Sequence, residues 1–403
     1  MKILVLNCGN SSVIFRLFNT EKMEHLIGGH IDRIGSKESS LISQVPMYKE
    51  KRMSLLVKDH EQALDIILKA ICNQDYGIIE SICDIDAVGH RVVHGGEAFT
   101  ESVLIDEAVF RKIKACIRFA PLHNPPNIEG IRTSLYLIPF ARQVAVFDTA
   151  FHQSMGDHVY TYALPYEWYE EWGIRRYGFH GTSHKYVAHR AARMLGKPIE
   201  ELRLIICHLG NGSSITAVKE GKSIETSMGF TPLEGLVMGT RCGDIDPAIP
   251  LHIMKEEDLT PAQMDRILNK KSGLFGLTGG DSDLRTIEEK AEAGSERHRL
   301  ALKIITHRIK KYIGAYAAVL GGLDGVIFTA GIGENSSTVR RMSCEGLSFL
   351  GIEIDPTENE NNETCISRGK TSILVIPTNE ELAIAHEVVD VLAKKREPVK
   401  IGE

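Results

Sequence analysis

The sequence predicts an α/β protein built from two related domains. Three short aliphatic runs, at residues 3–6, 204–207 and 325–328, each lead into a turn rich in glycine and small hydroxyl residues. Helix-like and strand-like segments alternate between these runs, which is typical of a mixed α/β fold. The first two turns, at 7–12 and 208–214, resemble each other and suggest a duplicated domain. A chain of 403 residues is also longer than one hydrophobic core usually serves.

Composition excludes several classes of protein. The chain is 43% hydrophobic and 25% charged, with a net charge of −6, which is ordinary for a globular protein. It has no long basic run, so we expect neither a nucleic-acid partner nor a membrane partner. Its eight cysteines are scattered without a CxxC pair, which indicates reduced thiols rather than disulfides or a zinc site. Because no signal-peptide segment opens the chain, we expect a cytoplasmic protein.

The elements of the first half follow from capping residues and apolar spacing. In order, we expect a hairpin over 3–18, a helix opened by Asp59, a buried strand and turn over 87–96, a helix from Asp106 to the prolines of 121–126, and a strand over 142–147. The helix after Asp59 would bury Ala63, Ile66, Ile67, Ala70 and Ile71.

The second half of the chain repeats this alternation of strands, turns and helices. We expect strands at 204–207 and 215–218, a tight hairpin at 220–222, a long helix over about 295–320, the third glycine turn at 329–337, a polar surface loop at 355–368 and a last helix from 378. The apolar stretch 313–332 is interrupted by glycines, so it predicts a helix end, a turn and a strand rather than a membrane span. The long helix would bury Leu300, Ile304, Ile309, Tyr312 and Tyr316.

A capping box is predicted at the start of the last helix. Thr378 and Glu381 have the spacing at which each side chain satisfies a backbone amide of the first turn. Glu380 would then be free to point elsewhere.

Three oxygen-bearing side chains are candidates for a cation site. Asn7 ends the first strand, where it would either cap the turn or ligate Mg²⁺. Asp148 follows a strand, the usual place of an active carboxylate in an α/β fold, although it could also cap what comes next. With Glu380 they predict a site for a hard cation.

Two arginines are candidates for binding an anion. Arg91 lies in an otherwise apolar strand, where it needs either an internal ion pair or a bound anion. Arg241 lies in a glycine-bounded loop and is either solvated or part of a site. As a pair they could clamp a phosphoryl group or a carboxylate.

The histidines argue against a metal site. His90 and His94 would be about 13 Å apart on a strand, too far to share a metal. His180 and His184 have no third ligand nearby. His180, next to glycines, is better interpreted as a hydrogen-bond donor to an anion.

The nucleotide motifs point to one architecture. No GxxxxGK[ST] sequence is present, and 331–336 reads GxGxxS without the acidic residue of a dinucleotide-binding unit. An ATP site built from two related hairpin turns and a third glycine loop favours two actin-like ATPase (ribonuclease H-like) domains with an interdomain active-site cleft. We expect the first over 1–149, completed by a helix at about 383–403, and the second, nucleotide-binding domain over 150–382.

Eight blocks spread over the chain resemble the acetate kinase family. They are GHRVVHGG at 89–96, APLHNP at 120–125, FDTAFH at 147–152, YGFHGTSH at 177–184, HLGNGSS at 208–214, TSMGFTPLEGLVMGTR at 226–241, TAGIGEN at 329–335 and PTNEEL at 377–382. The resemblance implies reversible, Mg²⁺-dependent phosphoryl transfer from ATP to acetate, giving acetyl phosphate and ADP, by a homodimer. The alternatives are a kinase of propionate or another short-chain acid, and a nucleotide-binding switch protein with impaired catalysis.

The resemblance also implies residue roles. Arg91 and Arg241 would hold the carboxylate and the γ-phosphoryl group, His180 would bond the group in transit, and Asp148 would orient acetate or a metal-bound water as the acid/base. The metal, Mg²⁺ or Mn²⁺ in its place, would be held by Asn7 and Glu380. The implied substrate-binding residues are Arg91, Val93, Leu122, His123, Phe179 and Pro232. The implied nucleotide-binding residues are His208, Leu209, Gly210, Asn211, Gly212, Asp283, Leu284, Arg285, Gly331, Ile332, Gly333, Glu334 and Asn335.

Three positions depart from the family pattern. Asn10 replaces a serine, Ile14 replaces a lysine credited with helping to hold ATP, and Asp281 adds a charge before the nucleotide segment at 283–285. We expect these changes to affect nucleotide binding rather than the acyl site.

Overall fold

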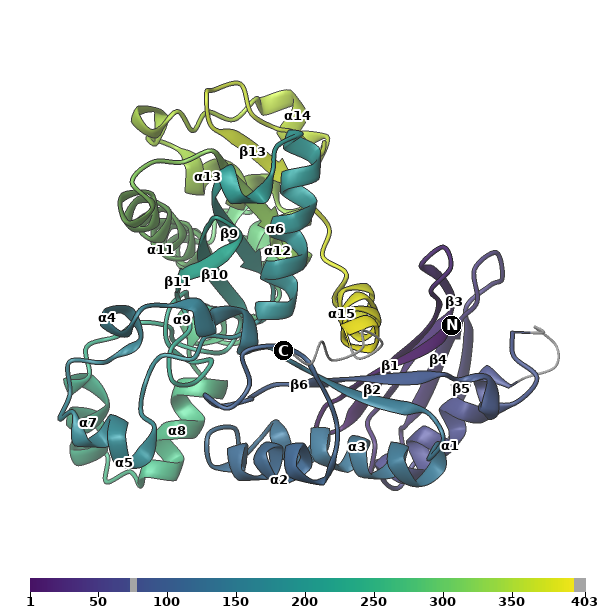
Figure 1. The fold of residues 1–403 in the computed structure, drawn as a ribbon. Helices are drawn as coiled ribbons and strands as arrows, with labels where there is room; N and C mark the ends of the chain where they lie inside the picture. Colours follow the sequence, from purple (N-terminus) through teal and green to yellow (C-terminus); the bar gives the residue numbers. More distant parts are fainter. Residues whose placement is uncertain (73–77, 395–403) are drawn as a thin grey trace, which may run out of the picture. The chain divides into compact units, whose positions relative to one another are not determined.

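The computed structural model describes residues 1–72 and 78–394, and the chain divides into two units (Figure 1). Unit 1 comprises Met1–Phe151 and Asn379–Glu403, and unit 2 comprises His152–Thr378. Within the described residues, no helix combines the length and the apolar character needed to cross a membrane.

Unit 1 is built on an eight-stranded sheet with the order β5-β4-β3-β2-β1-β6-β8-β7. Its strands are β1 (Lys2–Cys8), β2 (Ser12–Asn19), β3 (Glu24–Asp32), β4 (Ser40–Gln44), β5 (Lys51–Ser54), β6 (Ala87–Val92), β7 (Val103–Leu104) and β8 (Arg142–Phe147). β1, β6 and β8 run parallel to one another, whereas β1 and β2 form the predicted antiparallel hairpin. The carboxyl ends of the three parallel strands therefore share one edge of the sheet.

Helices cover both faces of this sheet (Figure 1). One face packs on α1 (His60–Ile71) and α3 (Asn124–Leu137), with α2 (Glu107–Ala115) beside α3, and the other face packs on α15 (Glu380–Lys394). Strand alternation explains the division, because Leu4 and Leu6 of β1 belong to the core under α1, whereas Ile3 and Val5 belong to the core under α15.

Unit 2 is built on a five-stranded sheet with the order β11-β10-β9-β12-β13. Its strands are β9 (Arg203–Leu209), β10 (Ser213–Lys219), β11 (Lys222–Thr226), β12 (Gly325–Thr329) and β13 (Ser372–Val375). In Figure 1 the sheet lies between α6 (Gly181–Leu195) and the long helix α11 (Glu296–Leu320). The other helices of unit 2 are α4 (Asp157–Tyr160), α5 (Glu167–Trp172), α7 (Ala248–Glu256), α8 (Pro261–Lys270), α9 (Gly273–Thr278), α10 (Leu284–Glu292), α12 (Ala330–Asn335), α13 (Ser337–Cys344) and α14 (Pro356–Glu360).

The two sheets share a pattern of pairing. In each, an antiparallel hairpin (β1–β2 or β9–β10) has a first strand that pairs in parallel with a later strand (β6 or β12). The predicted mixed α/β fold class is therefore confirmed, and so are the two strand-turn-strand units that suggested a duplication.

Several local expectations were wrong. Leu300 is 56% exposed, and α11 instead buries Leu302 and Ile305. Ile304 and Tyr312 are only partly buried, as are Ile66 and Ala70 of α1. The helix from Asp106 ends earlier than expected, at Ala115, and Pro125 and Pro126 do not stop it but begin α3, where proline in the first turn loses no hydrogen bond. The third glycine turn is the short helix α12, and the polar loop at 355–368 contains α14.

Candidate active site

A cluster of charged side chains lies at the carboxyl edge of the unit 1 sheet. Asn7 is on β1, Arg91 is on β6, and Asp148, only 1% exposed, follows β8. The Arg91 guanidinium donates to both oxygens of Asp148, from Nε to Oδ1 at 3.1 Å and from Nη2 to Oδ2 at 2.6 Å. Its Nη1 donates to Asn7 Oδ1 at 3.3 Å. The structure therefore brings these three predicted residues together, with the internal ion pair that the sequence left as one alternative for Arg91.

Glu380 joins this cluster from the first turn of α15. Its Oε2 lies 3.7 Å from Arg91 Nε. Burial opposes the charged form of Arg91, but the carboxylates of Asp148 and Glu380 outweigh it and raise the pKa of Arg91. Arg91 is therefore a fixed cation between two carboxylates.

The oxygen atoms around Arg91 fit a hard cation. Mg²⁺ is usually bound in proteins by one or two carboxylates, together with substrate phosphates and water. Asn7 and Glu380 offer an amide oxygen and a carboxylate, and Asp148 lies beside them. Over the described part of the chain, no three acidic, histidine or cysteine side chains form a metal-binding group, so this set would need ligands from the substrate.

The predicted capping box is wrong, although its consequence for Glu380 holds. Asn379 caps α15, because its Oδ1 accepts from the Leu382 amide at 3.0 Å. The Thr378 hydroxyl is 2.7 Å from Ser183 Oγ instead. Glu381 pairs with Arg16, with 3.7 Å between Oε2 and Nη1. Glu380 takes no part in the cap and is left beside Arg91.

A second cluster lies in unit 2, over the turn between β9 and β10. A Cβ placed on Gly212 would be 3.4 Å from Arg241 Nη1 and 3.5 Å from His180 Nε2. The absence of a side chain at Gly212 therefore leaves an open space beneath both groups. His180 has a left-handed backbone with a φ of 57°, and its ring stacks on His208 with centroids 4.2 Å apart.

Arg241 differs from Arg91 in its partners. Its Nη1 donates to the Pro232 carbonyl at 3.1 Å, and within the described ranges no carboxylate forms an ion pair with it. Burial lowers the pKa of Arg241. Arg241 is thus partly desolvated without a counter-ion, which is the state in which an arginine gains most from binding an anion.

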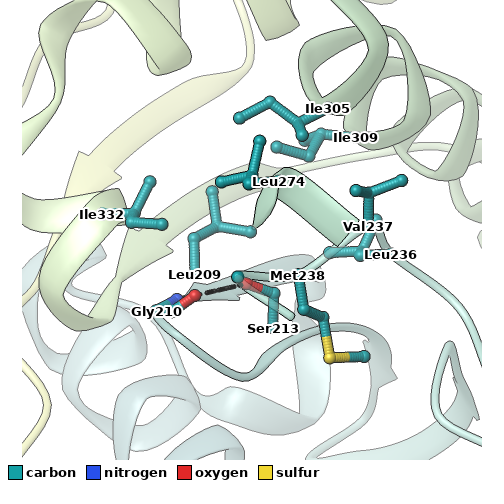
Figure 2. Close-up of a pocket in the computed structure, with 11 residues that line it drawn as sticks. Leu209, Gly210, Ser213, Leu236, Val237, Met238, Leu274, Ile305, Ile309 and Ile332 are labelled. Carbon is teal, nitrogen blue, oxygen red and sulfur yellow. Dashed lines mark hydrogen bonds between the residues drawn. The ribbon is translucent and has the colours of Figure 1, made fainter. Parts of the chain in front are cut away.

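Two of the predicted nucleotide residues of the second turn, Leu209 and Gly210, line a small apolar hollow (Figure 2). Leu209 and Gly210 lie on one side of it, and Ile332 of α12 lies on another. The Gly210 amide donates to Ser213 Oγ at 3.2 Å, which holds the turn in shape. The Asn211 carbonyl accepts from the Gly239 amide at 3.1 Å, which ties the turn to the segment that carries Arg241.

The other predicted nucleotide residues have structural tasks as well. Asp283 caps α10 by accepting from the Thr286 amide at 3.1 Å. Leu284 belongs to the core of unit 2 and Arg285 is exposed. On α12, Gly331 faces open space, Gly333 packs against β9 and β12, Glu334 accepts from the Thr378 amide at 3.1 Å, and Asn335 donates to the Gly331 carbonyl at 2.8 Å.

The extra charge of Asp281 is balanced locally. Its Oδ2 lies 2.6 Å from Lys290 Nζ and 2.9 Å from His298 Nε2. These partners lower the pKa of Asp281, so the charge is compensated within the loop.

The predicted acyl-pocket residues come from both units. In unit 1, Val93 is buried and its amide donates to Asn127 Oδ1 at 3.0 Å. Leu122 is 52% exposed, and His123 immediately precedes α3. In unit 2, Phe179 is buried, and Pro232 contributes the carbonyl that holds Arg241.

Sequence reasoning missed two residues next to the predicted ones. Arg16 follows Ile14 by two positions on β2 and so lies on the same face of the sheet. The two-residue alternation of a strand could have identified it from the sequence. Ser214, the last residue of the turn at 208–214, contacts the rings of His180 and His184, and these contacts with α6 and its N-cap are not visible in the local sequence.

Comparison with known proteins identifies the family. The family model described as "Acetokinase family" matches residues 2–386. An acetate kinase of Dictyoglomus thermophilum is 53% identical over 98% of this chain and 100% of its own length. One of Carboxydothermus hydrogenoformans is 52% identical, again over 98% of this chain and 100% of its own length.

Solved structures agree. The crystal structure of Porphyromonas gingivalis acetate kinase superposes with a TM-score of 0.93 at 45% identity, covering 97% of this chain and 99% of its own. A propionate kinase from Francisella tularensis superposes with a TM-score of 0.90 at 44% identity, covering 96% and 98%. The chain therefore belongs to the acetokinase family, the acetate kinases.

Proposed function

We propose that this protein transfers the γ-phosphoryl group of ATP reversibly to the carboxylate of acetate, giving acetyl phosphate and ADP. The observation that carries the proposal is the contrast between the two predicted arginines. Arg91 is a cation fixed by Asp148 among oxygen ligands, whereas Arg241 is partly buried beside His180 without a counter-ion. Phosphoryl transfer to a carboxylate needs cations both at the acceptor and at the transferring group.

The chemistry requires little beyond positioning and neutralisation of charge. Acetate is already ionised near pH 7, so no strong base has to create the nucleophile. In our proposal Arg91 holds the carboxylate of acetate while Asp148 fixes the orientation of its guanidinium. Arg241 and His180 donate hydrogen bonds to the oxygens of the transferring phosphoryl group, where negative charge must be stabilised.

The metal and the nucleotide belong to the same proposal. Asn7 and Glu380 would hold Mg²⁺, or Mn²⁺ in its place, which supplies further neutralisation of the phosphate oxygens. The turn at 208–212, the segment at 283–285 and the helix residues at 331–335 would bind ATP or ADP. We also propose a homodimer, by resemblance to the family, and a cytoplasmic location, since the cysteines of the described residues are all free thiols.

A propionate kinase is the second candidate, because one of the superposing structures is a propionate kinase. Val93 favours the smaller acid, because a smaller residue there would enlarge the pocket for the acyl chain. One methylene changes discrimination by only about 1–3 kcal/mol, so we expect propionate to react more slowly and not to be excluded.

The test is a hydroxamate assay for acyl phosphate with acetate, propionate and butyrate, each with and without ATP. We expect ATP-dependent product, with acetate the best acceptor. Arg91→Ala and Arg241→Ala should each lower turnover at least about 100-fold. The matched control is Arg203→Ala, which removes an arginine–aspartate pair of similar geometry on β9 (3.0 Å from Nε to Asp324 Oδ2) outside the site. Equal losses in all three variants, or near-normal turnover in the first two, would remove the arginines from the mechanism.

A further inference from the structure

The hydroxyl group of Ser214 lies between two histidine rings. Ser214 Oγ is 3.0 Å from His180 Nδ1 and 2.7 Å from His184 Nε2. Ser214, on β10, and His184, on α6, are both fully buried. His180 is the residue that, in the proposed function, contacts the transferring phosphoryl group.

This arrangement allows only two patterns of protons. A serine hydroxyl has one hydrogen, so it can donate to only one of the two ring nitrogens. The other nitrogen must then carry a hydrogen and donate to Ser214 Oγ. Either His184 donates from Nε2 and Ser214 donates to His180, or His180 donates from Nδ1 and Ser214 donates to His184.

The second ring nitrogen of His184 decides between them. His184 Nδ1 is buried and has no hydrogen-bond partner among the residues that the structure describes. Burial, and then the nearby rings of His152 and His208, hold the pKa of His184 well below its ordinary value, so the ring is neutral with a single N–H. A buried N–H without an acceptor is rarer and costlier than a bare acceptor. The hydrogen of His184 therefore belongs on Nε2, where it has an acceptor.

We propose that His184 and Ser214 are positioning residues that fix His180 in the tautomer with its hydrogen on Nε2. His184 donates to Ser214, Ser214 donates to His180 Nδ1, and the N–H of His180 is then on the nitrogen that lies over Gly212 with Arg241. This inference rests on the proposed function, since it assigns a purpose to that N–H: a neutral His180 can donate to a phosphoryl oxygen without first taking up a proton.

The surroundings of His180 make a neutral donor useful. The groups near its ring include His208 of β9, Ser214 of β10 and the guanidinium of Arg241. A cation nearby opposes a second positive charge on an imidazole. The tautomer of His180 with its hydrogen on Nε2 supplies a hydrogen-bond donor without adding a positive charge beside Arg241.

Nitrogen-15 spectra of histidine-labelled protein test the tautomer directly, because protonated and unprotonated ring nitrogens resonate far apart. The His180 signals are identified by their loss in His180→Gln. In the native protein we expect Nδ1 unprotonated and Nε2 protonated. The reverse pattern would overturn the proposal, and this measurement needs no folded variant of Ser214 or His184.

Activity gives a second test. Ser214→Ala and His184→Leu should lower kcat between about two-fold, if half of the molecules keep the wrong tautomer, and about 100-fold, the loss expected for a missing donor. KM for ATP and for acetate should change less. The deficit should narrow as the pH falls, because a doubly protonated His180 carries a hydrogen on Nε2 in any case. His184→Gln, which keeps an N–H donor, should recover part of kcat.

Ser223→Ala is the matched control, since it removes another buried serine–histidine hydrogen bond of unit 2, 2.8 Å from Ser223 Oγ to His152 Nδ1. It should leave the His180 spectrum unchanged. A deficit in Ser214→Ala that is independent of pH, or an equal spectral change in the control, would contradict the positioning role. If the native protein made no acyl phosphate, the proposed function would fail while the tautomer would still be read from the spectrum.

Discussion

Replacing Arg91 by methionine should destabilise unit 1 as well as abolish activity. Asp148 is 1% exposed and receives two hydrogen bonds from Arg91. Removing one partner of a buried ion pair costs about 3–5 kcal/mol, because the other charge stays buried. The Arg91 side chain keeps 18% of its surface exposed, so some water can reach the site and we expect the lower end, about 3 kcal/mol.

Asp148→Asn in the same background should restore much of this loss. The amide has no charge to bury, so we expect the double variant to be about 2 kcal/mol more stable than the sum of the two single changes implies. All three variants should remain inactive, which separates the role of the pair in folding from its role in the reaction.

Denaturant unfolding can be followed separately for the two units. Both tryptophans of the chain, Trp168 and Trp172, lie in unit 2. Tryptophan fluorescence therefore reports unit 2, while far-ultraviolet circular dichroism reports both units. We expect the Arg91 variant to shift only the dichroism transition. A shift below about 0.5 kcal/mol, the usual size for a surface substitution, or strict additivity in the double variant would refute the reasoning.

Four further outcomes are expected. Asn379→Ala should lower the stability of unit 1 by about 1 kcal/mol through loss of the α15 cap, whereas Thr378→Ala should not, as measured by denaturant unfolding. Gly212→Ala should fold normally, since its φ is not left-handed, but its methyl group would fill the open space of the unit 2 cluster and lower kcat/KM at least about ten-fold. Ile14→Lys places an ammonium group on a 37% exposed position of β2 and should tighten MgATP by about 1 kcal/mol in calorimetry, less at high salt. Burial lowers the pKa of His90 from 6.5 to about 4. As the pH is lowered, His90 therefore takes up its proton in the unfolded chain before it does so in the folded chain. The free energy of unfolding should fall by about 3 kcal/mol as the pH drops from 6.5 to about 4. His90→Asn should remove this loss.

Each of these has a clear contrary result. If Thr378→Ala lowered the stability of unit 1 more than Asn379→Ala does, the capping-box assignment would be right after all. Normal kinetics in Gly212→Ala would mean that the phosphoryl group binds elsewhere. Unchanged ATP affinity in Ile14→Lys would mean that the β2 position is remote from the nucleotide. An identical pH profile in His90→Asn would assign the acid sensitivity to other groups.

The sequence could predict the edge of the unit 1 sheet because the signals there are local. Asn7 and Asp148 come at the ends of aliphatic runs and Arg91 lies near the end of an apolar strand, and parallel strands must bring such positions together. Asp59 and Asp106 were correctly predicted as helix caps for the same reason, since a cap depends on a few neighbouring residues.

Tertiary contacts decided what local signals could not. Thr378 and Asn379 can both cap a helix, and the contact of Thr378 with Ser183 leaves the task to Asn379. On α11 apolar residues occupy more than one face, so periodicity alone did not distinguish Leu300 from Leu302. The contact between Ser214 and His184 joins a strand to a helix, and no spacing in the sequence reports it.

The order of the elements along the chain has a consequence for synthesis on the ribosome. Gly89 lies so close to α15 that a Cβ there would be 2.7 Å from Ile384, so this helix is an integral layer of unit 1. Yet α15 is translated after the whole of unit 2, His152–Thr378. At about 5–20 residues per second, synthesis of unit 2 takes on the order of tens of seconds. During that time α15 does not yet exist, so the sheet face that carries Ile3 and Val5 is not covered by it. We therefore expect the nascent chain to expose this apolar face during that interval, and Glu380 reaches the site only after the whole of unit 2 has been synthesised.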